Sequence, residues 1–160
     1  MDHIDGTVSS YQAMKASLTN IMHKHPKVWA VENLDALRES LRPTPEDVLG
    51  LTHGSSHADS ELFEGMTLEY QWIRCGEGMD MHSHSWWHLF FLISGQVTIS
   101  FEDGSERLLC PGDVAFVPPG APHGFRNSDI AIDAVMYSLT NKAALARIGQ
   151  LGAASTVTVE

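Results

Sequence analysis

Three histidines lie close together in a segment that begins and ends with glycine, residues 76–95 (GEGMDMHSHSWWHLFFLISG). Side chains alternate between the two faces of an extended strand, so His82 and His84 point to the same side. His88 keeps this parity and opens an apolar run over residues 88–93, which is typical of a buried strand. Imidazole nitrogen is the side-chain ligand most often used for divalent transition metals near neutral pH. The segment therefore predicts histidines that converge on one metal ion inside an all-β core.

Short apolar runs separated by glycine and proline turns continue from residue 63 to residue 140. Residues 96–101 alternate between apolar and polar side chains, and the following Glu-Asp-Gly-Ser sequence is a hairpin signal. A fourth histidine, His123, ends another segment framed by glycine and proline, residues 112–123. Many short strands of this kind favour an antiparallel sandwich or barrel.

The two histidine segments resemble the two sequence motifs of the cupin family. The first motif, a glycine, two histidines and a closing glycine at fixed spacing, is matched by Gly76, His82, His84 and Gly95. The second motif is matched at every position, by Gly112, Pro118, Gly120, His123 and Asn127. The departure is His88, which stands where the family usually has a glutamate ligand.

The resemblance implies a cupin jelly-roll barrel of two antiparallel sheets, with one barrel in the chain because no internal repeat is found. It also implies a single divalent metal ion held by His82, His84, His88 and His123. Iron or zinc is expected first, and nickel, manganese, copper and cobalt are also compatible with nitrogen ligands. Four neutral imidazoles would leave the full charge of the ion on the site, which favours a bidentate anion such as an enolate, phenolate or carboxylate.

Aromatic and apolar side chains near the histidines are candidates for the wall of a substrate pocket. Trp86 lies between the ligands, and Phe90 and Leu92 share the parity of His88. Trp72 is a further candidate, although the inward face of its strand is left open. With no glutamate at position 88, another group has to act as base, and Tyr70, Glu69 or a bound hydroxide are the candidates.

Helices are predicted at both ends of the chain. Apolar spacing indicates an amphipathic helix over residues 8–25 and a second over 28–41, and Thr44-Pro45 begins a short third helix that ends at Gly50. We assign residues 1–50 to an N-terminal helical extension, 51–62 to a linker, 63–140 to the barrel and 141–160 to a C-terminal helix and tail. Asn141 is the expected cap of the C-terminal helix.

Composition restricts the partners of the chain. The formal net charge of −10 disfavours nucleic acid and anionic membranes, both of which need basic surfaces. No apolar run reaches the ~20 residues that cross a bilayer, and the first residues lack a secretion signal, so a cytoplasmic location is expected. Two cysteines, Cys75 and Cys110, are too few for a disulfide framework.

These features predict a metal-dependent enzyme acting on a small, aromatic or enolisable organic molecule. By the family resemblance, an oxygenase or dioxygenase is preferred over a non-redox cyclase or isomerase that uses zinc as a Lewis acid. A third reading is a sensor or storage protein that binds a small molecule without turnover. The strand face with Leu89, Phe91 and Ile93 needs a cover, which predicts a homodimer.

Overall fold

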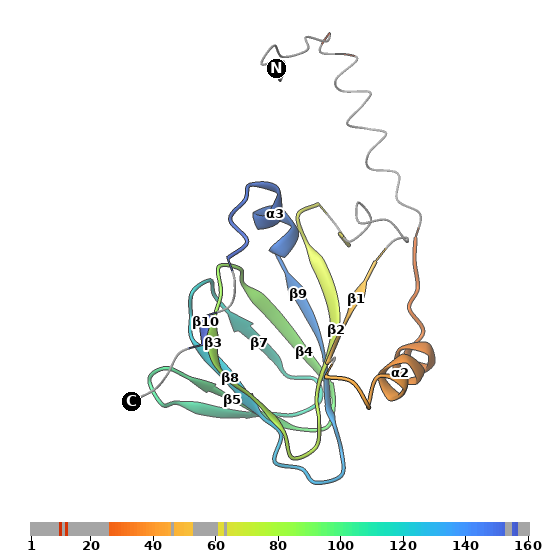
Figure 1. Cartoon of the computed structure of the whole chain (residues 1–160), viewed down its shortest axis with the longest axis vertical. Coiled ribbons are helices and arrows are strands. Elements are labelled where there is room, and N and C mark those ends of the chain that lie inside the picture. The colour runs from red at the N-terminus through yellow and green to blue at the C-terminus, as the bar shows by residue number, and fades with distance from the viewer. Residues whose placement is uncertain are drawn as a thin grey trace.

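The protein is described by a computed structural model that covers residues 10, 12, 26–45, 47–52, 61–62, 64–152 and 155–156. Two antiparallel five-stranded sheets face each other (Figure 1). The first sheet has the order β1 (Val48–Leu51), β2 (Thr67–Ile73), β9 (Ala134–Thr140), β4 (His88–Ser94) and β7 (Val114–Val117). The second has the order β10 (Ser155–Thr156), β3 (Gly78–Ser83), β8 (His123–Arg126), β5 (Val97–Phe101) and β6 (Glu106–Leu109). This arrangement confirms the predicted all-β jelly roll.

The core between the sheets follows from the alternation of the strands. In β5, Val97 and Ile99 are both 1% exposed and face inward. In β4, Phe90 and Leu92 are buried, whereas Phe91 and Ile93 face outward. The inward parity expected for the strand that begins at His88 is therefore confirmed.

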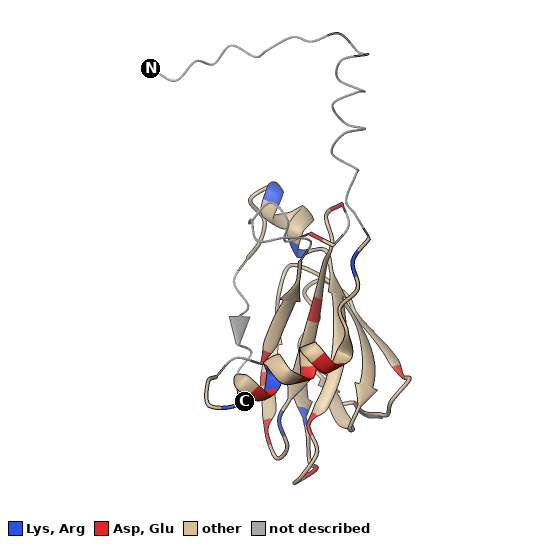
Figure 2. Cartoon of the chain, turned by 90° about the vertical axis from the view of Figure 1, so that its right-hand side faces the viewer, with Lys and Arg blue, Asp and Glu red and all other residues tan. Residues whose placement is uncertain are grey.

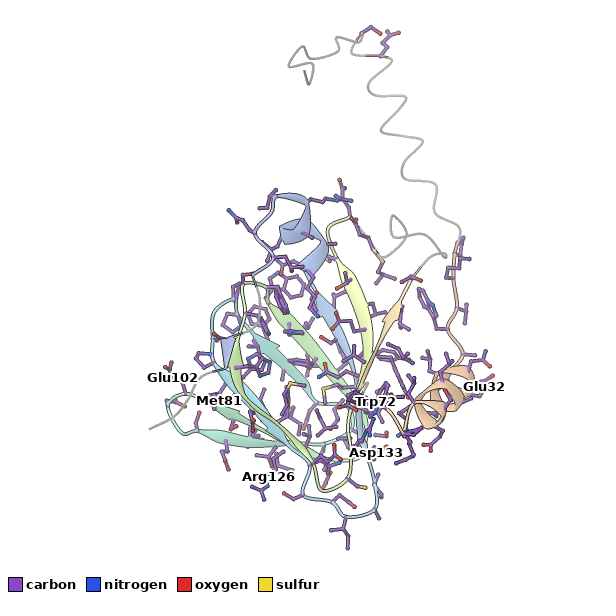
Figure 3. The ribbon with its side chains drawn as sticks, viewed as in Figure 1. Glu32, Trp72, Met81, Glu102, Arg126 and Asp133 are labelled. Carbon is purple, nitrogen blue, oxygen red and sulfur yellow. The ribbon has the colours of Figure 1, made fainter. Side chains whose placement is uncertain are left out.

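A second apolar cluster lies outside the first sheet, under helix α2 (Val31–Ser40). Leu34 of the helix packs with Tyr70 and Trp72 of β2, and α2 crosses the outer face of the sheet (Figure 2). Ion pairs hold the helix there, because the buried carboxylate of Asp133 accepts hydrogen bonds from Arg38 at 2.6 Å and Arg42 at 3.1 Å. Trp72 and Asp133 both lie on the side of the barrel that faces α2 (Figure 3).

The N-terminal predictions are met in part. The helix expected over residues 8–25 lies almost entirely outside the described residues, as does most of the linker. The helix expected over 28–41 is present as the shorter α2. The prediction of a helix that ends at Gly50 is wrong, because residues 48–51 form β1 and pair with β2, with Val48 opposite Gln71. The edge of β2 offers a full row of hydrogen bonds and burial for Leu51, which outweighs the local helix-start signal.

The C-terminal helix is α3 (Lys142–Arg147), but its cap differs from the prediction. The side-chain oxygen of Asn141 accepts a hydrogen bond from the backbone of Trp87, at 3.0 Å, in place of capping the helix. The hydroxyl of Thr140 instead accepts the backbone N–H of Lys142, at 3.1 Å. Within the described residues, no helix has the length and apolar character needed to cross a membrane.

The backbone at Gly95, the closing glycine of the first motif, requires a residue without a side chain. Its φ is +69°, and a Cβ atom at this position would lie 2.4 Å from the carbonyl oxygen of Asp133. We expect Gly95→Ala to lower the free energy of unfolding by about 3 kcal/mol or more, because backbone strain and a backbone clash add together. Chemical denaturation followed by circular dichroism measures this loss.

Gly104 provides a matched control for this substitution. Its φ is +79°, but an added Cβ atom would meet nothing within 4 Å. Gly104→Ala should therefore cost only about 1 kcal/mol, the strain alone. Equal losses for the two variants would show that the contact with Asp133 does not matter.

Candidate metal centre

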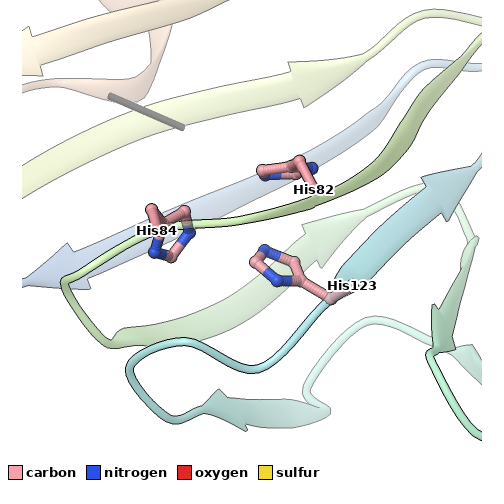
Figure 4. Close-up of side chains that lie close together, drawn as sticks. All are labelled: His82, His84 and His123. Atoms are coloured by element: carbon pink, nitrogen blue, oxygen red, sulfur yellow. The ribbon is translucent and has the colours of Figure 1, made fainter. Parts of the chain in front are cut away.

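Three histidines from two neighbouring strands gather at one end of the barrel. His82 lies in β3 and is the register partner of His123, the first residue of β8, and His84 follows directly after β3. Their ligand atoms all lie within 4.8 Å of one another, and Figure 4 shows the three rings grouped together. The backbone N–H of Gly120 donates to the carbonyl of His84 at 2.8 Å, which ties the turn before His123 to the loop after β3. Strand pairing and this turn together fix the trio.

Each of the three rings is oriented by a backbone carbonyl near it in sequence. The Nδ1–H groups of His82, His84 and His123 donate to the carbonyls of Asp80, Trp86 and Ala121, at 2.8, 2.7 and 3.0 Å respectively. This hydrogen bond fixes the tautomer, so that Nε2 carries the free lone pair. Nε2 of His84 is buried and has no hydrogen-bond partner within the described part of the chain. A buried acceptor without a partner is costly, and a divalent metal ion bound by the three Nε2 atoms would satisfy that of His84.

Burial favours the neutral form of His84 and of His123. The pKa of His84 is lowered to about 4, mainly because burial penalises the imidazolium, with His123 and His82 adding repulsion. Burial also lowers the pKa of His123. A metal ion therefore does not have to displace a proton from either ring at neutral pH. His82 is partly exposed, so the centre is reached from solvent on that side.

His88, predicted as a fourth ligand, is not a member of this group. Its Nδ1–H donates to the hydroxyl of Ser138 at 2.6 Å, and its Nε2 accepts the indole N–H of Trp86 at 2.8 Å. The ring also stacks on Phe90, with ring centres 4.7 Å apart. Its pKa is lowered to about 2, chiefly by burial. The strand parity brings His88 to the inner face as predicted, but hydrogen bonds occupy both of its nitrogens.

A cavity of about 150 Å³ adjoins the histidines. Its walls combine the four inner histidines with aromatic, apolar, acidic and basic side chains. The lining residues are Val48, Glu69, Gln71, Met79, His82, His84, Trp86, His88, Phe90, His123, Phe125 and Lys142. Of the predicted wall residues, the structure thus places Trp86 and Phe90 on the cavity, whereas Leu92 belongs to the core below it.

Tyr70 and Trp72 are corrections to the sequence analysis, because both point away from the cavity. The Tyr70 hydroxyl donates to Asp35 of α2 at 2.7 Å, and burial together with that carboxylate raises the tyrosine pKa. Neither residue can act on a molecule at the histidines. The alternation of β2 instead turns Glu69 and Gln71 inward.

Gln71, Val48, Met79, Phe125 and Lys142 are wall residues that the sequence analysis missed. For Gln71 a signal existed, since it has the opposite parity to the aromatic pair on β2. For Lys142 none existed, because its position depends on where α3 packs.

Asn127, the last residue of the second motif, has a structural role. Its side-chain amide donates to the carbonyls of Ile73 and Ile132, at 3.0 and 2.9 Å, and its oxygen accepts the backbone N–H of Asp129. The side chain is 1% exposed and lies away from the histidines. It joins the end of β2 to the loop before β9.

The depressed histidine pKa values predict how the metal-free protein responds to acid. In an unfolded chain, histidines are protonated near pH 6.5. In the folded protein, burial lowers the pKa of His84 to about 4 and that of His88 to about 2, so both stay neutral over this range. Between these values the unfolded state binds more protons, so the free energy of unfolding falls as the pH is lowered from about 6.5. Each such histidine contributes up to about 1.4 kcal/mol per pH unit.

Urea denaturation at several pH values, with a chelator present, measures this slope. The variant His88→Gln removes one of the titrating groups and should reduce the slope by about one proton. A slope that is unchanged in His88→Gln would contradict the assignment of His88 as a buried neutral ring.

Comparisons with known proteins agree with this fold. Residues 72–140 match the family model described as a cupin domain. Among proteins of curated function, none matches the chain in sequence.

Several solved structures share the fold. Salicylate 1,2-dioxygenase from Pseudaminobacter salicylatoxidans is similar with a TM-score of 0.73 and 18% identity, over 97% of this chain and 51% of that chain. A cupin-like protein from Thermotoga maritima is similar with a TM-score of 0.53 and 19% identity, over 69% and 74% of the two chains. The polyketide cyclase RemF from Streptomyces resistomycificus is similar with a TM-score of 0.54 and 14% identity, over 72% and 74%. The chain thus spans about half the length of the dioxygenase that it resembles.

Proposed function

Because residues 72–140 match a cupin-domain model, we propose that the chain is a metal-dependent cupin enzyme acting on a small organic molecule. The observation that carries the proposal is the buried Nε2 of His84, which has no hydrogen-bond partner among the described residues and belongs to the trio with His82 and His123. Three protein ligands leave coordination positions open for a substrate, and an open position distinguishes a catalytic metal site from a closed structural one. A bound metal would supply Lewis acidity or, if it is redox-active, dioxygen chemistry.

The size of the cavity limits the substrate. A space of about 150 Å³ holds roughly one benzene-sized ring. Phe90, Phe125 and Trp86 give this space flat apolar walls, which suit an aromatic or conjugated molecule. A fused polycyclic substrate needs several times this room. The proposed substrate is therefore a single ring or a short enolisable chain.

We place oxygenation first among the reaction types. The trio consists of imidazole nitrogen ligands without a carboxylate, and the partly exposed His82 leaves the centre open to solvent and small gases. The small cavity disfavours a cyclase for large polyketides. A fold shared with salicylate 1,2-dioxygenase is compatible with this choice, but at 18% identity the likeness extends to the fold alone.

One observation favours a non-redox alternative. Glu69 lines the cavity with a carboxylate that can take a proton from a substrate carbon or hydroxyl. A lyase or isomerase that uses zinc would need such a base. Glu69 replaces Tyr70 as the base candidate for either reaction.

The deciding experiment measures metal-dependent turnover. Protein loaded with Fe²⁺ or Zn²⁺ is incubated with hydroxylated aromatic acids and with 1,3-dicarbonyl compounds, while oxygen uptake and product mass are followed. An oxygenase consumes oxygen only with iron and adds oxygen atoms to the product. A lyase splits the substrate and an isomerase retains its mass, in both cases with zinc. Binding without turnover under all conditions would reject the enzyme proposal in favour of a sensor.

We also propose that the chain forms a homodimer through the outer face of β4 and β7. Phe91 and Ile93 are 39% and 41% exposed, and Val114 and Phe116 of the paired strand are 54% and 59% exposed. Clustered exposed apolar residues of this kind are typical of interfaces. Light scattering should give twice the chain mass, and Phe116→Glu should shift it to the monomer. A monomeric wild-type chain at working concentration would reject the dimer.

A further inference from the structure

A lysine and a glutamate form an ion pair on the wall of the histidine cavity. Nζ of Lys142 donates to Oε1 of Glu69 at 2.6 Å, and it lies 5.0 Å from the centre of the Trp86 ring. The Trp86 ring in turn stacks on His84, with centres 4.2 Å apart. An unbroken chain of contacts thus joins the ammonium group to the metal ligands. Of the described residues that line the cavity, Lys142 is the one with a permanent positive charge.

The position of Lys142 is fixed by its surroundings before any ligand arrives. Its backbone N–H donates to Thr140, and Asn141 beside it accepts from the backbone of Trp87. Two residues later, the backbone N–H of Ala144 donates to the carbonyl of Gly65, at 2.9 Å. The first turn of α3 is therefore tied to the loop between β3 and β4 and to the start of β2. A preorganised group of this kind loses little freedom when it binds a ligand.

The ammonium group has binding capacity left. It carries three N–H donors, and Glu69 accepts from one of them. The Lys142 side chain is 28% exposed and the Glu69 side chain 11%, so the lysine is the more accessible member of the pair. Glu69 and the Trp86 ring hold the ammonium at the cavity, and its remaining donors, which have no other partner among the described residues, can meet an anion there.

Building on the proposed function, we propose that Lys142 selects substrates that carry a carboxylate. The carboxylate binds the ammonium of Lys142 beside Glu69, while a hydroxyl or carbonyl oxygen of the same molecule reaches the three-histidine centre. The ring of the substrate lies in the cavity that Trp86 and Phe90 help to line. Two-point recognition of this kind defines the substrate class as a small aromatic or enolisable monocarboxylate.

The test compares two ligands that differ in this one charge. Isothermal titration with Zn²⁺-loaded protein measures the affinities of 2-hydroxybenzoate and its neutral amide, 2-hydroxybenzamide, without any turnover. We expect the wild-type protein to prefer the acid by about 10- to 100-fold, the range for a charge-assisted hydrogen bond. Lys142→Met should remove this preference and leave the affinity for the amide unchanged, and Lys142→Arg should restore most of it.

Arg147→Met is the matched control, since Arg147 lies on the same helix and pairs with Glu61 away from the cavity. This variant should keep the wild-type preference. If Lys142→Met retains the preference, or if the wild-type protein shows none, Lys142 only braces α3 and the inference is wrong.

The outcome is separable from that of the proposed function. A Lys142-dependent preference in a protein that never turns over substrate would support carboxylate recognition by a sensor. Metal-dependent turnover without the preference would leave the enzyme proposal intact and reject the role of Lys142. Urea denaturation of each variant shows whether the substitution has disturbed the fold, and Lys142→Arg keeps the inference testable if Lys142→Met does not fold.

Discussion

Replacing His84 with alanine is expected to abolish metal binding. Its buried Nε2 finds no partner in the part of the chain that the structure describes, and its ring lies 5.7 Å from His82 and 5.1 Å from His123, centre to centre. Removing one of three ligands should weaken the affinity by far more than the 10- to 100-fold effect typical of outer-shell residues. Elemental analysis after dialysis should find about one metal ion per chain in the wild-type protein and almost none in the variant.

His88→Gln is the matched control for this loss. His88 is also buried and also lies in the cavity wall, but hydrogen bonds to Trp86 and Ser138 hold its ring. The variant should keep its metal with only a small change in affinity. It should also keep the rise in melting temperature that a bound metal gives the folded state. Loss of metal in both variants would show that His88 is a ligand after all.

Replacing Trp86 with phenylalanine is expected to convert the three-histidine centre to a four-histidine centre. Ser138 holds His88 in the same tautomer as the other three rings, with the lone pair on Nε2. The indole N–H of Trp86 occupies that lone pair at 2.8 Å, and phenylalanine cannot. His88 lies next to His84, with ring centres 4.6 Å apart, so its freed nitrogen can join the group.

Electron paramagnetic resonance of Cu²⁺-loaded protein counts the coordinated nitrogens. We expect three in the wild-type protein and four in Trp86→Phe, with an affinity on the order of tenfold to a hundredfold tighter. The double variant Trp86→Phe, His88→Gln should return to three. The same nitrogen count in the wild-type protein and in Trp86→Phe would contradict the idea that the indole controls coordination.

The features that depend on local spacing could be predicted from the sequence. Strand alternation predicted that His82 and His84 point to one side and that His88 lies on the inner face of its own strand, and the turn glycines of the two motifs, such as Gly95 and Gly120, do have positive φ angles. These properties follow from the chain within a few residues of each position. Strand alternation and the turns were accessible for that reason, whereas the jelly roll and the convergence of His123 with His82 and His84 were expected from the family resemblance.

The features that depend on distant partners could not be predicted. The inward face of β2 is decided by α2, which covers Tyr70 and Trp72 and so turns Glu69 toward the cavity. The strand β1 exists because β2 has a free edge to pair with. The hydrogen bond from Trp86 keeps His88 out of the trio. The side-chain conformation of Trp86 cannot be predicted from the pattern of apolar residues.

The carbonyl groups that aim the three imidazoles lie within two residues of each ligand, on or beside β3 and β8. Much of the opposite wall, with Glu69, Gln71, Phe90 and Lys142, comes from the other sheet and from α3. Mutations can therefore change the residues of this opposite wall without moving the carbonyl groups that orient the three histidines. Proteins with this fold could therefore evolve new substrate specificities through substitutions on one sheet, while the metal site on the other sheet stays the same.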